Sequence, residues 1–328
     1  MKWEGRRVLV TGAGGFIGSH LTERLVDLGA TTRALILYNS TDSREWLENS
    51  VHSREIEFLP GDIRDGMRVR EALRNVDVVF HLAALISIPY SYHAPESYVQ
   101  TNILGTLNIL QVARDMGVER LVHTSTSEVY GTAKYVPIDE NHPLQGQSPY
   151  SASKIGADKI AESFHLSFDV PIVTVRPFNT FGPRQSTRAI VPTIITQCLS
   201  DSTVRLGNLR PTRDLNYVTN TVDGFIAAAE SPNTIGRTIN IGSGREISIR
   251  DLAHLIGRLM DLEVRIEGDD PRRTRPEGSE VERLLSNNTL ARELLGWEPA
   301  ISLEAGLSKT IEWIRSNKEK YRSDGYTI

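Results

Sequence analysis

The chain has 328 residues, of which 39% are hydrophobic and 24% are charged, and this composition suits a globular protein with one large domain or two smaller ones. The net charge of −4 and the lack of any run of about 18 apolar residues give no case for nucleic-acid binding or a membrane span. The single cysteine, Cys198, excludes an intramolecular disulfide framework and a cysteine-rich metal site, so we predict a core position for it and no metal.

The N-terminus has no apolar signal segment, so we expect a cytoplasmic protein. Residues 7–11 form a short apolar run that predicts a buried strand, and Gly12, Gly15 and Gly18 follow it. Apolar residues then recur with helical spacing up to Gly29. Glycines between a strand and a helix let the backbone approach a pyrophosphate, which the helix N-terminus attracts. This pattern predicts a dinucleotide-binding turn.

The second predicted strand, residues 32–37, ends where the adenosine ribose of a dinucleotide usually binds. An acid at that place favours NAD because it binds the ribose 2′-hydroxyl. The sequence there is Tyr38-Asn39-Ser40-Thr41, with Arg44 just beyond. The choice between NAD and NADP therefore stays open.

A third strand is predicted at residues 55–59, and Gly61-Asp62-Ile63 follows it. Asp62 has two compatible interpretations: its carboxylate accepts from an adenine amino group, or it caps a helix that begins near Asp65. The fourth strand, residues 76–82, ends in His81-Leu82-Ala83-Ala84, where small residues let a cofactor lie close to the sheet. We interpret His81 itself as a core histidine.

Two long helices are predicted at residues 97–116 and 150–168, and each has apolar residues on more than one side. One face of such a helix covers the sheet, and another can meet a partner chain.

A fifth strand is predicted from Leu121, between these two helices in the sequence. It ends in residues with hydroxyl groups and one carboxylate, among them Thr126 and Glu128. Tyr150 and Lys154 are four residues apart and share a face of the following helix. A nearby ammonium lowers the pKa of a phenol, which is about 10 in water, by roughly 1–3 units. We therefore expect a tyrosinate-like base at Tyr150, a substrate hydroxyl held by Thr126 and a second base at Glu128. Two bases suggest chemistry with two proton-transfer steps.

The alternation of strands and helices, continued by a sixth strand at residues 172–175, predicts an α/β fold with a doubly wound parallel sheet. Residues 180–214 look loop-rich and residues 263–282 irregular. The remaining predicted elements are a sheet strand at 238–242 and amphipathic helices at 249–262 and 303–317. We predict a dinucleotide-binding domain of residues 1–179, with 215–243 returning to it, and a smaller, partly interleaved C-terminal substrate domain of residues 180–214 and 244–328.

Several motifs, in the same order along essentially the whole chain, resemble those of the extended short-chain dehydrogenases/reductases that act on nucleotide sugars. They are Thr11-Gly12-x-x-Gly15-x-x-Gly18, Gly61-Asp62-Ile63, His81-Leu82-Ala83-Ala84, Thr101-Asn102-x-x-Gly105-Thr106, Tyr150-x-x-x-Lys154, Arg176-Pro177-Phe178-Asn179 and Arg213-Asp214-x-x-Tyr217-Val218. The resemblance implies an NAD(P)-binding Rossmann fold, a tightly bound NAD or NADP regenerated in each cycle, and a homodimer or homotetramer formed through helices 97–116 and 150–168.

Within this superfamily, Thr126-Ser127-Glu128-Val129-Tyr130-Gly131 resembles the signature of the 4,6-dehydratases, whereas the sister 4-epimerases normally lack the glutamate. Thr-Ser-Glu resembles the GDP-mannose form, and Thr-Asp-Glu is usual in enzymes for dTDP-glucose. Further stretches resemble the GDP-N-acetylglucosamine 4,6-dehydratase of legionaminic acid biosynthesis, namely Pro89-Tyr90-Ser91-Tyr92, the segment 124–133 and Pro192-Thr193-Ile194-Ile195-Thr196-Gln197.

This resemblance implies a lyase reaction on a nucleotide-diphosphate sugar. Tyr150, helped by Lys154 and Thr126, takes the proton of the C4 hydroxyl while a hydride moves from C4 to NAD(P)⁺. Glu128 removes the C5 hydrogen, water leaves from C6, and the hydride returns to C6. Ser127 occupies the place of the usual general acid, so either it relays a proton through water or Glu128 serves both steps. The product is a 4-keto-6-deoxy sugar nucleotide.

The matching positions also imply binding residues. The implied cofactor contacts, besides Tyr150 and Lys154, are Gly12, Gly15, Phe16, Ile17, Gly18, Asn39, Ser40, Asp62, Ile63, Leu82, Ala83, Ala84 and Thr101. The implied substrate contacts are Ser87, Thr126, Asn179, Arg188, Val191, Arg213, Arg275 and Glu280. Arg213 and Arg275 match positions that grip the diphosphate, which suits a guanidinium fork, and Glu280 matches one that holds the nucleotide ribose.

Two alternatives to the dehydratase stay open. A nucleotide-sugar 4-epimerase shares the first oxidation, and Glu128 argues against it. A non-catalytic dinucleotide-binding protein can share the fold, and the pair Tyr150 and Lys154 argues against that. The sequence leaves open guanine versus uracil or thymine in the substrate and the C2 substituent of its sugar.

Overall fold

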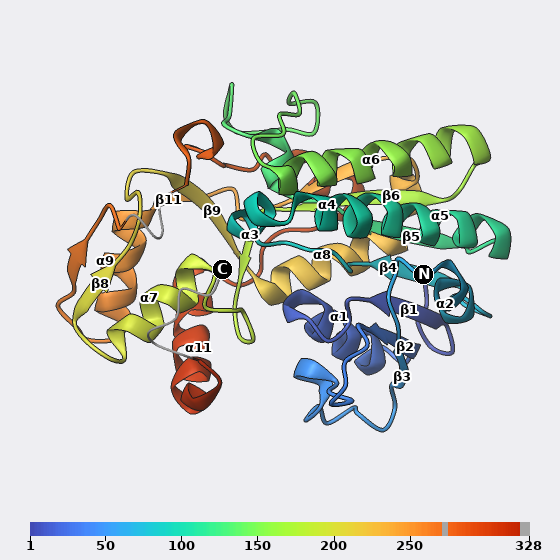
Figure 1. Ribbon diagram of the computed structural model, residues 1–328, viewed down its shortest axis with the longest axis horizontal. Coiled ribbons are helices and arrows are strands. Elements are labelled where there is room, and N and C mark those ends of the chain that lie inside the picture. Colours follow the sequence, from blue (N-terminus) through green and yellow to red (C-terminus); the bar gives the residue numbers. More distant parts are fainter. Residues whose placement is uncertain (271–274, 322–328) are drawn as a thin grey trace.

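The structure, a computed structural model, describes residues 1–270 and 275–321 (Figure 1). Within these residues, seven strands form the main sheet in the order β10-β6-β5-β4-β1-β2-β3. They are β1 (Arg7–Thr11), β2 (Thr31–Ile36), β3 (Glu57–Pro60), β4 (Val78–His81), β5 (Arg120–Thr124), β6 (Ile172–Pro177) and β10 (Thr238–Ile241). All neighbouring pairs are parallel, so their C-terminal ends lie along one edge. The predicted doubly wound α/β fold is confirmed.

Helices cover both faces of the main sheet (Figure 1). One face carries α2 (Gly66–Ala72), α5 (Gly105–Met116) and α6 (Pro149–Phe168), and the other carries α1 (Phe16–Asp27) and α8 (Val218–Glu230). Successive strand residues enter opposite cores: Val8 and Val10 join the apolar cluster on the α1 side, and Leu9 joins the cluster on the α5 side. Burial on both faces explains why the strands are continuous apolar runs.

The helix predicted at residues 97–116 is not one regular α-helix. It begins as α4 (Pro95–Tyr98), continues as a π-helical segment, η2 (Val99–Leu104), and ends as α5. The π-helical segment contains Thr101 and Asn102, and segments of this kind occur frequently at functional sites. A hydrophobic pattern of period 3.6 does not register this local widening.

A smaller set of elements lies beside the main sheet, at the left of Figure 1. Residues 180–214, predicted to be loop-rich, contain much more regular structure than expected. The elements in and around them are β7 (Asn179–Phe181), α7 (Ile190–Cys198), β8 (Thr203–Arg205) and β9 (Thr212–Tyr217). Helix α7 is buried on nearly all sides, including Cys198, so it lacks the polar face that marks a surface helix in a sequence.

The C-terminal elements complete this smaller part. They are α9 (Ile249–Leu259), α11 (Leu303–Ser316), β11 (Glu246–Ser248) and β12 (Arg265–Glu267), the last within a segment predicted to be irregular. Helix α10 (Thr289–Leu295) instead contacts β10 and α8 of the main sheet layer. Strand β9 lies between β11 and β7, and β12 pairs with β8. Strand β10 pairs with β6 and so belongs to the main sheet. The domain division at residues 179, 214 and 243 itself stays a prediction.

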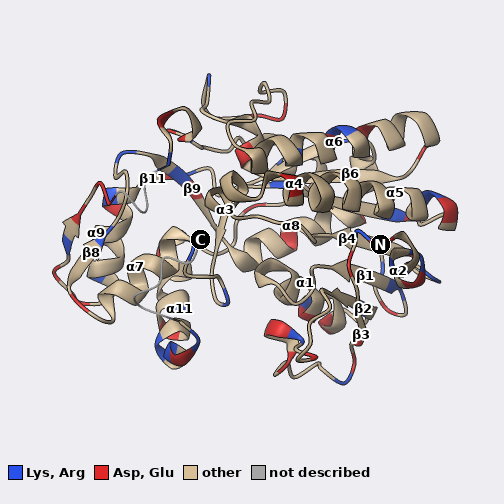
Figure 2. Cartoon of the chain, in the orientation of Figure 1, with Lys and Arg blue, Asp and Glu red and all other residues tan. Residues whose placement is uncertain are grey.

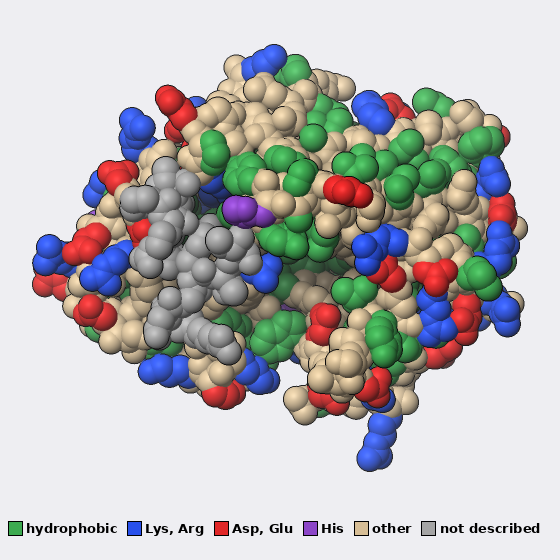
Figure 3. Space-filling model, viewed as in Figure 1, with side chains coloured by type: hydrophobic (Ala, Val, Ile, Leu, Met, Phe, Trp, Pro, Cys, Tyr) green, Lys and Arg blue, Asp and Glu red, His purple; other side chains and the backbone are tan. Residues whose placement is uncertain are grey.

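Charged residues of both signs are spread over the outer helices and loops (Figure 2). The molecular surface is hollowed between α1 and the region of α3 (Ile88–His93) and α4 (Figure 3). In residues 1–270 and 275–321, none of the helices has both the length and the apolar character that crossing a bilayer requires.

Candidate active site

The glycine-rich turn joins β1 to α1 at the C-terminal edge of the main sheet. Gly12 has φ +68°, and a Cβ there would lie 2.9 Å from the backbone nitrogen of Ala83. A Cβ on Gly18 would lie 2.1 Å from the carbonyl oxygen of Gly12. Among the described residues, no side chain caps α1, whose N-cap residue is Gly15. The turn therefore leaves N–H groups of the helix start available to an anion such as a pyrophosphate.

His81 links the ends of β1 and β4 to helix α5. Thr11 Oγ1 accepts hydrogen bonds from the backbone N–H groups of Leu82 and Ala83, both at 3.1 Å, and donates to His81 Nδ1 at 2.8 Å. His81 Nε2 then donates to Thr106 Oγ1 at 3.0 Å. Burial holds the pKa of His81 well below its usual value, so the ring is neutral. The interpretation of His81 as a core histidine is confirmed.

Asp62 lies after β3 but does not cap α2. Its carboxylate pairs with the Arg64 guanidinium at 2.6 Å and accepts the Arg64 N–H at 2.8 Å, and the hydrogen bond from the Arg64 side chain lowers its pKa. Asp65 caps α2 instead, because it directly precedes the first helical residue, Gly66, and accepts from two backbone N–H groups. The capping interpretation of Asp62 is therefore wrong, and its adenine contact stays a prediction.

Asn39 organises the loop after β2. Its Oδ1 accepts from the backbone N–H groups of Thr41 and Ser43 at 3.2 and 2.9 Å, while Ser40 is exposed. This turn is typical of asparagine, which imitates a backbone turn with its side chain. The cofactor roles of Asn39 and Ser40 stay predictions.

The segment after β5 brings a carboxylate to the same sheet edge as the glycine-rich turn. Thr126 precedes a 3-10 turn, η3 (Ser127–Tyr130), and its Oγ1 accepts from the backbone N–H of Glu128 at 3.2 Å. The Glu128 residue is 8% exposed, and its Oε2 lies 3.9 Å from Arg275 Nη1. Ser127 is buried beside it. A buried carboxylate that lies 3.9 Å from Arg275, and close enough to Arg213 for its charge to oppose the lowering of that guanidinium's pKa by burial, is available both as an ion-pair partner and as a base.

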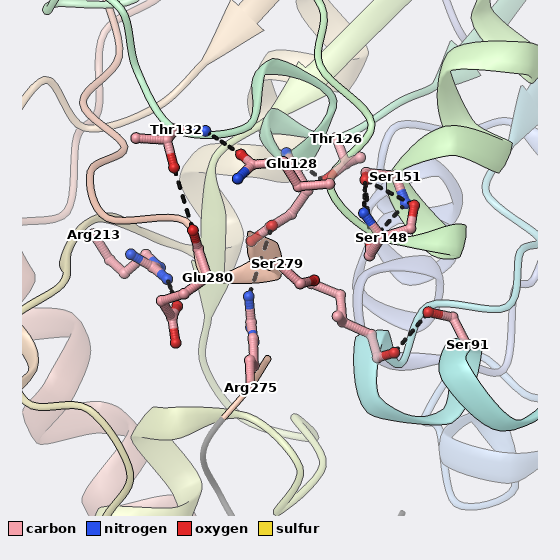
Figure 4. Close-up of polar contacts among 12 residues, drawn as sticks. Ser91, Thr126, Glu128, Thr132, Ser148, Ser151, Arg213, Arg275, Ser279 and Glu280 are labelled. Carbon is pink, nitrogen blue, oxygen red and sulfur yellow. Dashed lines mark hydrogen bonds and ion pairs between the residues drawn. The ribbon is translucent and has the colours of Figure 1, made fainter. Parts of the chain in front are cut away.

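Helix α6 presents Tyr150 next to this carboxylate. The helix begins with Pro149 and a reciprocal capping box, in which Ser148 and Ser151 each accept from the other's backbone N–H (Figure 4). Burial raises the pKa of Tyr150 well above its usual value; the Thr126 hydrogen bond opposes this shift, and the negative charge of Glu128 adds to it. The predicted lowering of the Tyr150 pKa is therefore wrong for the chain by itself.

Lys154 and Asp158 extend the same face of α6 by one turn each. Lys154 Nζ donates to the backbone carbonyl of Thr124 at 2.6 Å. Burial lowers the pKa of Lys154 to about 8, and the nearby charge of Asp158 opposes that shift. Asp158 itself accepts from His123 at 3.0 Å and pairs with Arg176 at 3.0 Å. Burial alone would raise the pKa of Asp158, but these partners lower it to about 2.

We predict that the pH dependence of activity reports the lowered pKa of Lys154. A lysine with an ordinary pKa near 10.4 stays charged far above neutrality, whereas Lys154 loses its proton as the pH rises through about 8. If the Lys154 cation supports catalysis, kcat/KM falls above about pH 8. Asp158→Asn removes a negative charge that favours the ammonium, so this descending limb moves to lower pH. An unmoved limb in a folded Asp158→Asn variant would refute the assignment.

The predicted substrate residues of the smaller part face Glu128 across the site (Figure 4). Arg275 pairs with Glu128 as described, and Arg213 Nη2 lies 3.3 Å from Glu280 Oε1. Arg275 Nη1 is buried and has no hydrogen-bond partner within the described residues, so a ligand oxygen can be its partner. Thr132 Oγ1 donates to the backbone carbonyl of Glu280 at 3.2 Å, which fixes this segment over the site.

The other predicted substrate residues differ in exposure. Ser87 is the N-cap of α3, and the buried Oδ1 of Asn179 has no partner among the described residues. Val191 is 1% exposed in the core at the start of α7, so its side chain does not face a ligand. Arg188 is exposed, yet close enough to Tyr98 for its charge to lower the pKa of that phenol against the raising effect of burial.

The remaining cofactor contacts implied by the motifs lie near the same edge. Phe16 and Ile17 start α1, Thr101 is half-buried in η2, Ile63 is buried, and Ala84 is half-buried after β4. The roles of all these residues stay predictions. Arg272 and Arg273, which the motifs left unassigned, lie outside the described residues.

Comparison with known proteins shows the family. The family model described as GDP-mannose 4,6 dehydratase matches residues 9–310. The chain belongs to this family of extended short-chain dehydrogenases/reductases. A UDP-glucose 4-epimerase of Mycolicibacterium smegmatis is 34% identical over 319 residues, which are 95% of this chain and 100% of that relative.

Solved structures of both reaction types resemble this member of the GDP-mannose 4,6-dehydratase family. Epimerase Mth375 of Methanothermobacter thermautotrophicus has a TM-score of 0.89 and 33% identity, and the match covers 98% of this chain and 96% of that chain. DesIV, a dTDP-glucose 4,6-dehydratase of Streptomyces venezuelae solved with NAD bound, has a TM-score of 0.87 and 29% identity, covering 96% and 99%. Overall likeness therefore does not separate epimerase from dehydratase, and the site residues must.

Two residues with no predicted role contact helix α6, which carries Tyr150 and Lys154 in this family member. The Tyr98 ring lies edge-on to Tyr150 with 6.2 Å between centroids, and its hydroxyl donates to the Ser87 carbonyl. Asn102 accepts from the Leu85 N–H at 2.9 Å and donates to Ser153 Oγ at 2.9 Å. Asn102 belongs to the motif Thr101-Asn102-x-x-Gly105-Thr106, so the sequence did point to this position.

A third link joins the two parts of the molecule. The hydroxyls of Tyr92, on α3, and Ser279 are 2.5 Å apart, although they are separated by 187 positions in the sequence. Gln147 Nε2 also donates to the carbonyl of Gly278 at 3.2 Å. These bonds hold the segment that carries Arg275 and Glu280 against the dinucleotide-binding part. No local pattern in the sequence predicts such pairs.

Proposed function

We propose that this protein is a nucleotide-sugar 4,6-dehydratase that converts a GDP-hexose, such as GDP-N-acetylglucosamine, into a 4-keto-6-deoxy sugar nucleotide. The observation that carries the proposal is the buried Glu128 carboxylate at the end of β5, electrostatically coupled to the Tyr150 phenol and 3.9 Å from Arg275. A base for a second proton, beyond the one that Tyr150 takes, is what elimination of water requires and simple inversion at C4 does not.

The protein is a nucleotide-sugar-modifying short-chain dehydrogenase/reductase with an NAD-type cofactor. The turn from Gly12 to Gly18 fits an NAD-type cofactor, because any Cβ on Gly12 or Gly18 would fill the space against Ala83 and the Gly12 carbonyl. When bound, such a cofactor would supply reversible hydride transfer, and the positive charge of its oxidised form would oppose the raised pKa of Tyr150.

In the first half of the reaction, Tyr150 Oη takes the proton of the C4 hydroxyl. Thr126 Oγ1 already accepts from the Glu128 N–H, so its own proton is free to bond the phenol oxygen and hold it in place. Lys154, one turn further along α6, supplies a cation that the Thr124 carbonyl and Asp158 keep near this end of β5. The product of this half is a ketone at C4, which acidifies the neighbouring C5 hydrogen.

In the second half, Glu128 removes the C5 hydrogen as a proton, and the C6 hydroxyl leaves as water. The proton for the leaving hydroxyl comes either from Glu128, once it is protonated, or through water held by Ser127. The C5–C6 double bond that results then takes back the hydride at C6 and a proton at C5, which gives the 4-keto-6-deoxy sugar. Each positioned acid or base contributes about 10²–10⁴-fold to a rate. Arg275 stabilises the Glu128 carboxylate before the transfer and does not hydrogen-bond it closely enough, at 3.9 Å, to prevent protonation.

The substrate diphosphate is proposed to bind Arg213 and Arg275. Arg213 lies beside Glu280, and Arg275 reaches toward Glu128 from the opposite side of the site (Figure 4). A planar guanidinium matches phosphate oxygens with two parallel hydrogen bonds, and Arg275 Nη1, which makes no hydrogen bond within the described residues, provides one donor. Glu280 would hold the ribose of the nucleotide. The GDP-N-acetylglucosamine substrate and the legionaminic acid route rest on sequence resemblance.

A nucleotide-sugar 4-epimerase is the second candidate, and the 34% identity to a UDP-glucose 4-epimerase favours it. Both reactions use Tyr150 for the first oxidation. An epimerase then needs rotation of the ketone and no base at C5, so it gives Glu128 no role.

The mass of the product separates the two candidates. Purified protein is incubated with GDP-, UDP- and dTDP-hexoses, and each product is examined by mass spectrometry. The dehydratase produces a species lighter by about 18 Da, the mass of the water expelled. An epimerised product of unchanged mass would support the second candidate, and bound cofactor with no turnover on any sugar nucleotide would support a non-catalytic protein.

We also propose a homodimer or homotetramer formed through α4, α5 and α6. Val99 and Leu104, in the π-helical segment η2 between α4 and α5, are 46% and 48% exposed, and Leu166 of α6 is 73% exposed. Figure 3 shows apolar side chains gathered over the α4 and α5 region. Light scattering at working concentration tests this, and a monomer would contradict it.

A further inference from the structure

The loop that follows β2 folds back onto the glycine-rich turn. The backbone N–H of Trp46 donates to the carbonyl of Gly14 at 3.2 Å, and Leu47 is fully buried beneath it. The Trp46 ring lies edge-on to Trp313 of α11, with 6.2 Å between centroids. The loop is therefore held from the turn on one side and from the C-terminal part on the other.

This loop sets the Glu45 carboxylate on the glycine-rich turn. A Cβ on Gly14 would lie 2.8 Å from Glu45 Oε2 and 2.9 Å from Glu45 Cβ. Glu45 has φ +54°, an uncommon conformation for a residue with a side chain. Although the residue as a whole is exposed, loss of solvent around its carboxyl raises the Glu45 pKa. Within residues 1–270 and 275–321, no hydrogen bond or ion pair reaches this carboxylate.

The Glu45 carboxylate lies where this fold binds the adenosine ribose of a dinucleotide. The backbone N–H of Gly12 donates to the carbonyl of Leu35, near the end of β2, at 3.1 Å, so the turn and the strand end are adjacent. In this fold the adenosine ribose lies beside the end of the second strand, and an acid there accepts from the 2′-hydroxyl. Residues 38–41 offer no acid, but Glu45 returns to the same place from further along the chain.

We propose that Glu45 binds the 2′-hydroxyl of the adenosine ribose and excludes a 2′-phosphate, so that the protein selects NAD over NADP. This inference rests on the NAD-type cofactor of the proposed function and not on the dehydratase reaction. Glu45 is then the acidic residue at the adenosine ribose, which the sequence alone did not identify. A 2′-phosphate carries a charge near −2, and like charges placed together are strongly disfavoured.

The basic residues nearby are engaged elsewhere. The Arg44 guanidinium lies over the Phe58 ring, 4.4 Å from its centroid, and Arg64 pairs with Asp62 at 2.6 Å. A 2′-phosphate would need a cation as its partner. Arg44 is the alternative candidate for contact with the 2′ position of the ribose. A guanidinium that lies over an aromatic ring can also bind a phosphate, and this would favour NADP.

The test measures dinucleotide binding and needs no substrate. Nucleotide that copurifies with the protein is released by heating and identified, and the affinities of NAD⁺ and NADP⁺ for the stripped protein are measured by calorimetry. We expect copurified NAD and an affinity for NAD⁺ at least about 10-fold higher than for NADP⁺. Glu45→Gln should narrow this ratio by about 10-fold, chiefly by strengthening NADP⁺ binding.

Glu48→Gln is the matched control. Glu48 lies in the same loop, its Oε2 accepts the Arg44 N–H at 2.9 Å, and glutamine keeps an acceptor there, so the ratio should not move. Equal affinities in the wild type, an unchanged ratio in Glu45→Gln, or tight NADP⁺ binding lost in Arg44→Ala would each overturn the role of Glu45. Binding of neither dinucleotide would overturn the proposed cofactor as well, so the two failures are distinguishable.

Discussion

Glu128→Gln is expected to lower kcat by about 10²–10⁴-fold while the variant remains folded and binds sugar nucleotide. Glutamine has the shape of glutamate but cannot take a proton from C5. Because Tyr150 and Lys154 are intact, the first oxidation still proceeds, and reduced-cofactor absorbance builds up on mixing with substrate. Steady-state turnover by mass spectrometry and a stopped-flow absorbance trace measure these two effects separately.

Glu280→Gln is the matched control for this change. Its carboxylate pairs with Arg213 at 3.3 Å on the substrate side of the site, away from the reacting carbons in the proposed arrangement. It should raise KM with a much smaller effect on kcat, because it removes binding and not a proton acceptor. If Glu128→Gln keeps its turnover, Glu128 has no part in the mechanism, and a 4-epimerase becomes the better supported function.

Tyr150→Phe is expected to stop the reaction one step earlier. The change removes only the hydroxyl and keeps the ring that packs 6.2 Å from Tyr98, so the melting temperature should change little. Turnover should fall by about 10²–10⁴-fold, and no reduced-cofactor absorbance should appear with substrate. The absorbance trace thus distinguishes the two variants, since it is present in Glu128→Gln and missing in Tyr150→Phe.

Tyr98→Phe serves as the control for Tyr150→Phe. The Tyr98 hydroxyl donates to the Ser87 carbonyl and so supports the position of the site without touching the reacting atoms in our account. We expect a loss of turnover well below about 10-fold, smaller than for a proton-transferring group. A Tyr150→Phe variant that still oxidises substrate would show that another group takes the C4 proton.

The strand–turn–helix at the N-terminus and the parallel sheet follow from local patterns. Residues 7–11 are a continuous apolar run because both faces of β1 are covered, and the glycines mark the turn between this run and the helical spacing that follows. The sequence did not predict helix α7, because burial on nearly all sides removes the alternation of polar and apolar residues that identifies a helix. The π-helical turn around Asn102 likewise leaves no trace in a hydrophobic pattern.

The site was predictable as a set of residue types but not as an electrostatic environment. Tyr150 and Lys154 share a helix face by spacing alone, yet the raised pKa of Tyr150 depends on burial and on Glu128, which only the fold brings near. Arg275 meets Glu128, and Ser279 meets Tyr92, across long stretches of chain. Glu45 shows the same limit, because its place on Gly14 depends on how a loop folds back.

The most direct test of the account is the wild-type reaction run in heavy water, with the position of deuterium in the product read by NMR. Removal of the C5 hydrogen by Glu128 and its later replacement from an exchangeable acid predict a product that has lost water and carries one solvent deuterium at C5, with none delivered from solvent to C6. A product of unchanged mass with no deuterium at C5 would contradict the account.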